Sequence, residues 1–228
     1  MAGKLVVIEG LDGSGKSTQI TLLKNLFDER GIKNKFIHFP MMNQGIYGTL
    51  IAEFLRGEFG SVECVHPKLV ALLFANDRKE NIQKVEKWLQ EGYIVFADRY
   101  VNSNIAFQCA KVEGEVSKTA LKEWILQFEF HSNNLPLPHK SVYLDVPFSF
   151  IEHSLTNSRT GEDRDYLDGL IDIHEDSLDL QMQVMAEYKK MIGEQPSFVN
   201  ITCTNEHGTL MSPQSINAEI LAAMELNL

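Results

Sequence analysis

The sequence lacks long hydrophobic runs. Its longest apolar runs, such as Leu5–Ile8, are only a few residues, whereas a transmembrane helix needs about 20. The N-terminus enters an expected strand by about Lys4, with no preceding basic segment, long apolar run or Arg/Ser-rich transit stretch. These absences exclude a membrane-spanning helix from the prediction and indicate a cytoplasmic protein without a membrane partner.

Cysteine is also scarce. The chain has three cysteines, Cys64, Cys109 and Cys203, and none belongs to a Cys-x-x-Cys pair. An odd number of cysteines is not typical of a disulfide framework. We therefore expect reduced thiols, in or near the core of a cytosolic protein.

Basic residues are fewer than acidic residues. The chain has 21 lysines and arginines against 31 aspartates and glutamates, which gives a net charge of −10. This balance argues against a nucleic-acid partner or an anionic lipid surface, because both favour a basic face. A small anionic ligand remains compatible with it, since a few arginines and backbone N–H groups can hold one inside an acidic protein.

The 228 residues suit one large domain, and short β-branched runs alternate with longer helical patterns along them. The expected strands are Lys4–Glu9, Lys35–Phe39, Tyr93–Ala97, Ser141–Val146 and Ser197–Thr202. The expected helices are Ser17–Arg30, Gly45–Gly57, Pro67–Glu91, one from about Ser103, Ser117–Phe130, Ser149–Asn157, Ile173–Ile192 and one capped by Ser212 that runs to about Leu226. This alternation predicts an α/β fold: a five-stranded parallel sheet with helices on both faces, in one domain over residues 1–228. Ligands of such sheets bind at the carboxyl ends of the strands.

A glycine-rich loop follows the first expected strand. Residues 10–17 read G-L-D-G-S-G-K-S and match the pattern G-x-x-x-x-G-K-[ST] at every defined position. The glycines allow successive backbone N–H groups to point at a phosphate, Lys16 would bridge the β- and γ-phosphates, and Ser17 would ligate Mg²⁺. The residues expected to bind ATP are Gly10, Asp12, Gly13, Ser14, Gly15, Lys16, Ser17 and Thr18. The sequence therefore predicts nucleoside triphosphate binding.

Several enzyme classes share this loop. A GTPase should carry an Asn-Lys-x-Asp-type guanine motif, which the sequence lacks. A motor ATPase is usually larger or built of repeats. A kinase needs a second pocket for an acceptor, and the remaining motifs favour that class over a regulatory module that binds nucleotide without turnover.

An Asp-Arg pair ends the third expected strand. Asp98 could hold Mg²⁺ there, and Arg99 could neutralise charge on a phosphoryl group in transit. The alternative is an ordinary ion pair at a strand end. On the expected helices, Phe74 and Arg78 are four residues apart, and so are Asn104 and Gln108. Phe74 could stack on a nucleobase while Arg78 binds its edge, and Asn104 and Gln108 could bind a base by hydrogen bonds. The alternatives are that Phe74 belongs to the core and that Asn104 and Gln108 belong to a solvated face.

Taken together, these residues resemble the thymidylate kinase family. The resemblance rests on the G-L-D-G-S-G-K-S-T loop, Phe39-Pro40, the L-L-F-A-N-D-R helix segment and D-R-Y followed by S-N-x-A-F-Q. It continues with Y-L-D-V-P and an arginine-bearing loop before D-x-H-E, and covers about residues 4–190. The resemblance implies a P-loop kinase fold, transfer of the γ-phosphate of ATP to dTMP with Mg²⁺, and a homodimer.

The resemblance also implies roles for single residues. Asp12 would contact the sugar hydroxyl of the acceptor, Phe74 would stack on its base, Arg78 would bind a thymine carbonyl, and Asn104 and Gln108 would complete the pocket. Arg99 would bridge the acceptor phosphate and the transferred phosphate. Arg159 and Arg164 would lie in a lid at about residues 157–169 and supply the catalytic basic charge, because the phosphate loop has no arginine. Lys16 and Arg99 complete the expected catalytic set.

Two further segments carry expectations. Asp172 and Glu175, in D-I-H-E, are expected to form a capping box at a helix start rather than a metal site. After Phe39-Pro40, Met41 and Met42 stand where the family typically has an arginine that clamps the acceptor phosphate. A thioether cannot replace that contact. The substitution leaves three alternatives: another cation takes over (Arg78, Arg99 or Arg56), acceptor affinity is weak, or the acceptor is another nucleoside monophosphate or a nucleoside.

Overall fold

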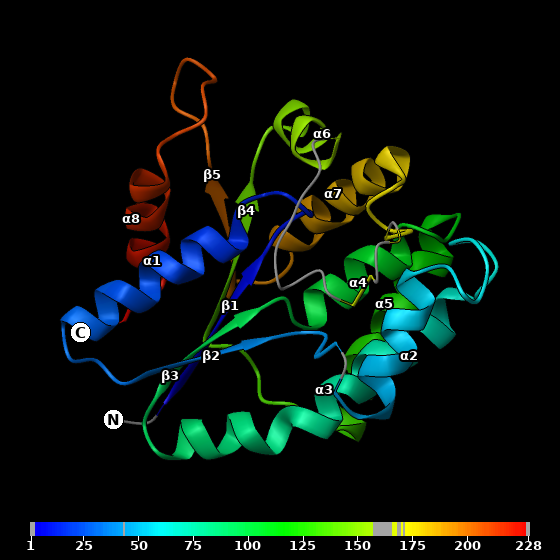
Figure 1. Cartoon of the computed structure of the whole chain (residues 1–228), viewed down its shortest axis with the longest axis horizontal. Coiled ribbons are helices and arrows are strands. Elements are labelled where there is room, and N and C mark those ends of the chain that lie inside the picture. Colours follow the sequence, from blue (N-terminus) through cyan, green and yellow to red (C-terminus); the bar gives the residue numbers. More distant parts are fainter. Residues whose placement is uncertain (1–2, 43, 157–165, 168–169, 171, 227–228) are drawn as a thin grey trace.

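The computed structural model describes residues 3–42, 44–156, 166–167, 170 and 172–226. In this part of the chain, five parallel strands form one sheet in the order β2-β3-β1-β4-β5 (Figure 1). The strands are β1 (Lys4–Glu9), β2 (Asn34–His38), β3 (Ile94–Asp98), β4 (Lys140–Asp145) and β5 (Phe198–Thr202). The predicted α/β fold with a five-stranded parallel sheet is confirmed, and each strand lies within two residues of its predicted bounds.

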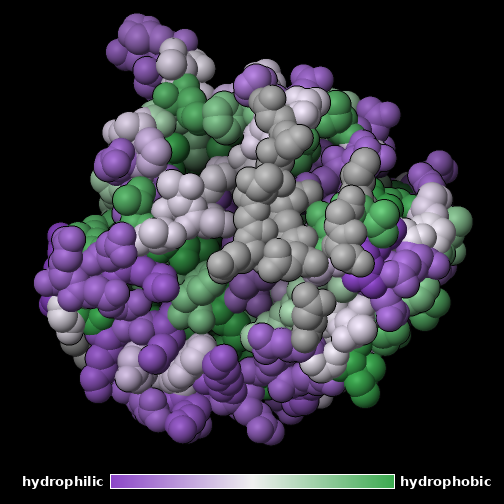
Figure 2. Space-filling model, viewed as in Figure 1, coloured by the Kyte–Doolittle hydropathy of each residue, from purple (hydrophilic) through white to green (hydrophobic). Residues whose placement is uncertain are grey.

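The helices lie on both faces of this sheet, as Figure 1 shows. Their bounds are α1 (Lys16–Glu29), α2 (Gly45–Leu55), α3 (Pro67–Gln90), α4 (Val101–Cys109), α5 (Glu115–Leu126), the π-helical segment η1 (Gln127–Ser132), α6 (Phe148–Thr156), α7 (Leu178–Ile192) and α8 (Pro213–Ala223). Helices α1 and α8 pack together on one face, whereas α3, α4 and α7 pack in sequence on the other. Hydrophilic side chains cover the outer sides of α1 and α3 in Figure 2.

The strand register sets the position of the site. β1 lies between β3 and β4, and Ile8 of β1 pairs with Asp98 of β3 while His38 of β2 pairs with the same Asp98. The middle strands are buried on both faces because helices cover them. Their carboxyl ends consequently meet at one edge, where the loop after β1 and the Asp98-Arg99 pair lie side by side.

Two expectations about helix starts have different outcomes. The cap of α8 is confirmed: the Ser212 hydroxyl accepts from the Ser215 backbone N–H at 3.1 Å, and Pro213 opens the helix. The capping box at Asp172 and Glu175 is wrong, because α7 begins at Leu178 with Ser177 as its cap. Asp172 instead accepts from the His174 backbone N–H at 2.7 Å in a turn that precedes the helix.

Two of the three cysteines lie in the core, as predicted. Cys109 and Cys203 are buried and all three thiols are free, but Cys64 is exposed, so placing it in or near the core was wrong. Cys64 follows a turn in the polar segment between α2 and α3, where its backbone N–H donates to the Ser61 carbonyl. Among the described residues, no helix is both long and apolar enough to cross a membrane.

Candidate active site

The glycine-rich loop joins β1 to α1 at the central edge of the sheet. Gly13 and Gly15 have φ values of 79° and 85°, a left-handed conformation that glycine adopts at no steric cost. A Cβ at Gly13 would also lie 2.7 Å from the Ser154 hydroxyl. Lys16 opens α1 and curls back over the loop, donating from Nζ to the Leu11 carbonyl at 2.9 Å and to the Gly10 carbonyl at 3.3 Å.

An open cavity runs from this loop to α3 and α4. It brings together predicted residues that lie far apart in the sequence. The predicted site residues that line it are Asp12, Lys16, Ser17, Phe74, Arg78, Asp98, Arg99, Asn104 and Gln108. The remaining predicted ATP contacts, Gly10, Gly13, Ser14, Gly15 and Thr18, belong to the loop and the first turn of α1 rather than to the cavity lining.

Asp98 lies at the end of β3, beside the loop. Its Oδ2 is 3.3 Å from His38 Nδ1, while Oδ1 is buried and has no hydrogen-bond partner among the described residues. Burial raises the pKa of the Asp98 carboxyl, but the hydrogen bond from His38 and the positive charge of Lys16 outweigh that effect and lower it. An ionised carboxylate with one unsatisfied oxygen and the Ser17 hydroxyl, two oxygen donors that line the same cavity, fit Mg²⁺.

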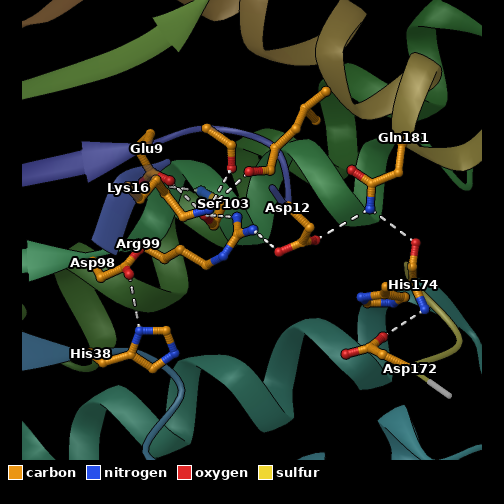
Figure 3. Close-up of polar contacts among 12 residues, drawn as sticks. Glu9, Asp12, Lys16, His38, Asp98, Arg99, Ser103, Asp172, His174 and Gln181 are labelled. Atoms are coloured by element: carbon orange, nitrogen blue, oxygen red, sulfur yellow. Dashed lines mark hydrogen bonds and ion pairs between the residues drawn. The ribbon is translucent and has the colours of Figure 1, made fainter. Parts of the chain in front are cut away.

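Arg99 and Asp12 form an ion pair across the centre of the cavity (Figure 3). Arg99 Nη2 donates to Asp12 Oδ1 at 2.6 Å, and Nη1 donates to the Ser103 hydroxyl at 3.1 Å. Its guanidinium carbon lies 5.1 Å from the centre of the Phe107 ring. Arg99 has φ of 64°, uncommon for a residue with a side chain, and a hydrogen bond from its N–H to the Ile8 carbonyl holds it there.

Glu9, a buried carboxylate that is not among the predicted site residues, is linked to this pair through Ser103. Glu9 accepts from the Tyr100 backbone N–H at 3.1 Å and from the Tyr188 hydroxyl at 3.0 Å, and Ser103 also bonds to it. Burial raises the pKa of Glu9 despite the nearby Arg99. The only sequence feature that could have indicated a role for Glu9 was its position as the last residue of β1, directly before the loop. An acidic residue in a hydrophobic strand does not indicate which residues it contacts.

The opposite wall of the cavity is built on α3, α4 and η1. Arg78 forms a bidentate pair with Glu129, Nε to Oε2 at 2.6 Å and Nη2 to Oε1 at 2.5 Å, and both side chains are almost fully buried. Asn104 Nδ2 donates to Glu129 Oε1 at 2.8 Å and to the Ala71 carbonyl at 3.0 Å. Asn104 Oδ1 is buried and has no hydrogen-bond partner in the described part of the chain. Glu129 thus orients two predicted site residues.

The segment before α7 forms a third side. His174 lines the cavity together with Asp172 and Tyr166, and the Tyr166 hydroxyl donates to Asp172 Oδ2 at 2.6 Å. Gln181 links this side to the centre, since its Nε2 donates to Asp12 Oδ2 at 3.2 Å and to the His174 carbonyl at 3.0 Å (Figure 3). The D-I-H-E pattern was the sequence signal for these residues, and it was wrongly interpreted as a helix cap.

Comparison with known proteins gives the family. A model of the thymidylate kinase family matches residues 8–210, most of the chain. The chain belongs to the thymidylate kinase family. The probable thymidylate kinase of Pyrococcus abyssi is 32% identical over 193 residues, which are 84% of this chain and 83% of that protein. The probable thymidylate kinase of Pyrobaculum aerophilum is 36% identical over 172 residues, covering 75% of this chain and 79% of that protein.

A solved structure of thymidylate kinase from Candida albicans has the same fold. It superposes with a TM-score of 0.70 at 22% identity and covers 98% of this chain and 92% of that one. This likeness supports the arrangement of strands and helices described above.

The two methionines after Phe39-Pro40 have different positions within this family fold. Met42 lines the cavity, whereas Met41 packs against the main core and donates its backbone N–H to the buried carboxylate of Asp77. Arg56 is bonded to Glu58 and to the Tyr166 carbonyl and does not line the cavity. Of the three arginines considered as replacements for the clamp, Arg78 and Arg99 are therefore the two at the cavity.

The predicted lid arginines belong to a segment that the structure describes only in part. Arg159 and Arg164 lie outside the described residues, as does most of the segment 157–169.

The Arg78–Glu129 pair gives a prediction about stability. Replacing Arg78 with methionine leaves Glu129 as an uncompensated buried charge, and we expect the free energy of unfolding to fall by about 3–5 kcal/mol. Urea unfolding followed by circular dichroism measures this change. The double variant Arg78→Met/Glu129→Gln should recover part of the loss, and Lys87→Met on the exposed side of α3 is the matched control. A loss below about 1 kcal/mol in Arg78→Met would contradict the assignment.

Proposed function

We propose that this chain is a kinase that transfers the γ-phosphate of ATP to dTMP and releases dTDP and ADP. The observation that carries the proposal is the cavity, which joins a phosphate-binding loop to a wall of hydrogen-bonding side chains on α3 and α4. Membership of the thymidylate kinase family supports the same reaction.

The donor side consists of the loop and the start of α1. Backbone N–H groups of a loop in this conformation, with the helix N-terminus behind them, bind the phosphates of ATP. Lys16, now bonded to two loop carbonyls, would contact the β- and γ-phosphates. Ser17 and Asp98 would hold Mg²⁺, which when bound neutralises phosphate charge and fixes the geometry of the triphosphate.

The acceptor side would position the monophosphate for in-line attack. One of its oxygens attacks the γ-phosphorus, and the bond from that phosphorus to the oxygen bridging the β-phosphate breaks. Arg99 lies between the loop and the acceptor wall, and its guanidinium would stabilise the charge on the transferred group. Asp12, which now pairs with Arg99, would contact the acceptor sugar. We propose Arg159 and Arg164 as additional positive charges over ATP, on the family resemblance.

The wall also supports a base such as thymine over cytosine. Asn104 Nδ2 is committed to Glu129 and Ala71, so its unpartnered Oδ1 can only accept a hydrogen bond. The N3–H of thymine is a donor, whereas N3 of cytosine is an acceptor. Arg78 would donate to a base carbonyl from the guanidinium edge that Glu129 does not occupy, and Phe74, one turn earlier on α3, would stack on the ring.

A homodimer and a cytoplasmic location complete the proposal. Ile46 on α2 and Leu69 on α3 are 71% and 56% exposed, so these two packed helices each offer an apolar side chain that a second copy could cover. Sedimentation equilibrium would measure the mass of the particle, and a monomer would contradict the dimer. Two buried free thiols and the use of ATP support a cytoplasmic location, which cell fractionation would test.

A panel of acceptors tests the proposed reaction. The purified protein, supplied with ATP and Mg²⁺, is assayed for ADP formation with dTMP, dUMP, dCMP, dGMP, UMP and thymidine. We expect the highest kcat/KM with dTMP. A higher value with dCMP, a purine nucleotide or thymidine would contradict the proposal and would make Met42 the first residue to examine in a changed acceptor pocket.

Asn104 gives the specificity prediction. Asn104→Ala removes the acceptor for N3–H, and we expect the ratio of kcat/KM for dTMP to that for dCMP to fall about tenfold or more, because a hydrogen bond to a buried group contributes about 1–3 kcal/mol. Asn102→Ala, on the same helix but lining a different cavity, is the control. An unchanged ratio in Asn104→Ala would mean that another residue reads the base.

A further inference from the structure

A lysine stands behind the acceptor wall, outside the cavity itself. Lys111 follows α4, and its Nζ lies 2.8 Å from His174 Nε2 and 3.1 Å from Gln108 Oε1. Both partners line the cavity, whereas Lys111 does not. One ammonium group therefore contacts two residues of the wall that come from different parts of the chain.

The chemistry of the ammonium fixes the orientation of Gln108. An ammonium donates hydrogen bonds and accepts none, so the atom of the Gln108 amide that faces Lys111 must be the carbonyl oxygen. The amide NH₂ is then the end directed away from the lysine. Because Gln108 is buried and lines the cavity, this orientation presents the NH₂ group to a bound acceptor.

The Lys111 ammonium also fixes the tautomer of His174. Its Nε2 faces the Lys111 ammonium and must accept, so the ring proton belongs on Nδ1. Burial lowers the pKa of His174 well below its usual value, and Lys111 lowers it further, which keeps the ring neutral. Burial also lowers the pKa of Lys111 to about 7, against the opposing charges of Asp172 and Glu63, so Lys111 is mainly an ammonium at pH 6.5, the pH chosen for the tests below.

Packing holds the imidazole in place. The His174 ring stacks on Phe107 with a centroid separation of 5.1 Å and an interplanar angle of 24°, and it meets the edge of Phe54 at 5.4 Å. Its backbone is bonded on both sides, to Asp172 and to Gln181. The ring therefore cannot easily turn to exchange its two nitrogens, and the tautomer decides which hydrogen bond it offers.

We propose that Lys111 is a positioning residue for acceptor specificity: by donating to Gln108 and His174 from behind the wall, it makes both of them hydrogen-bond donors toward the acceptor. The wall then selects a nucleotide that presents oxygen acceptors, carbonyl or sugar oxygens, at these two places. This inference rests on the proposed function, since it takes the cavity as the acceptor site. It adds a residue that touches neither substrate nor the reacting atoms.

The tautomer of His174 is the direct test, and it does not depend on activity. Protein labelled with ¹⁵N-histidine is examined by long-range ¹H–¹⁵N correlation at pH 6.5, with His174→Ala to assign the signals. We expect the Nδ1–H tautomer in the unmodified chain and in Lys111→Arg, and a shift toward Nε2–H in Lys111→Met. An Nε2–H tautomer in the unmodified chain, or no change in Lys111→Met, would overturn the inference.

Kinetics supply the second readout. At pH 6.5, in Lys111→Met we expect the KM for dTMP to rise about tenfold or more, with the KM for ATP unchanged and most of the effect reversed in Lys111→Arg. Lys87→Met is the control for loss of a lysine. Equal changes in both KM values, matched by a lower Tm, would show a purely structural role and overturn the inference. If the unmodified chain phosphorylates no nucleoside monophosphate, the proposed function fails, and the NMR result still decides whether Lys111 sets the polarity of the wall.

Discussion

Replacing Lys16 with methionine should abolish phosphoryl transfer while the chain remains folded. Lys16 is nearly buried, and its Nζ already lies over the loop, within 2.9–3.3 Å of two carbonyl oxygens. Methionine preserves the length of the side chain and removes the charge at the point where the β- and γ-phosphates would bind. Loss of one preorganised group of this kind costs at least about 10²–10³ in kcat.

The measurement is steady-state turnover with dTMP and ATP, compared with the unmodified chain. Lys87→Met, with a lysine 74% exposed on α3, controls for the loss of a positive charge. Circular dichroism checks that the Lys16 variant keeps its helices and sheet. Turnover within a factor of ten of the unmodified chain would contradict the role given to the loop.

Arg99→Lys should lower kcat by about a hundredfold or more. An arginine at the transferred phosphoryl group contributes about 10³–10⁵ in rate, and lysine keeps the charge but loses the planar fork that can bridge two phosphates. Lysine also retains a side chain at φ of 64°, so the backbone conformation is equally demanding in both proteins. The comparison therefore isolates the guanidinium.

The control for this substitution is Arg30→Lys, at the exposed end of α1. Stopped-flow measurement of product formation in the first turnover separates chemistry from product release. A change confined to the KM for dTMP, with kcat preserved, would mean that Arg99 binds the acceptor and does not stabilise the transition state. The close ion pair with Asp12 makes some change in KM expected in either case.

The sequence was most informative where local chemistry decides structure. The β-branched runs predicted each strand, most strongly β1 and β3, because a strand covered on both faces must be hydrophobic along its length. Ser212 and Pro213 predicted the start of α8 from capping alone. The phosphate loop was predictable for the same reason, since its glycines and its lysine act within eight consecutive residues.

Contacts between residues far apart in the chain could not be predicted from the sequence. Glu129 lies 51 positions after Arg78 and belongs to a π-helical segment, where the ordinary helical period no longer indicates which side chains face inward. Lys111 and His174 are 63 positions apart. The sequence gives each of these as a charged or polar side chain, and only the fold shows that they bond to one another behind the cavity.

The predicted helix start at Asp172 was wrong for a different reason. Asp172 does cap backbone N–H groups, as its residue type favours, but in a turn that ends before the helix begins. The capping residue was identified correctly, but the prediction that it caps a helix was wrong. The result changes the interpretation of the whole segment, because a turn at this point places His174 and Asp172 in the cavity wall.

The most direct test of phosphoryl transfer from ATP to dTMP follows the γ-phosphorus atom. The purified protein is incubated with Mg²⁺, dTMP and ATP labelled with ³²P at the γ-position, and the products are separated by chromatography, with Lys16→Met as the background preparation. We expect the label to appear in dTDP at a rate absent from the variant. Label that accumulates only as inorganic phosphate, or that enters dTDP equally in both preparations, would contradict this expectation.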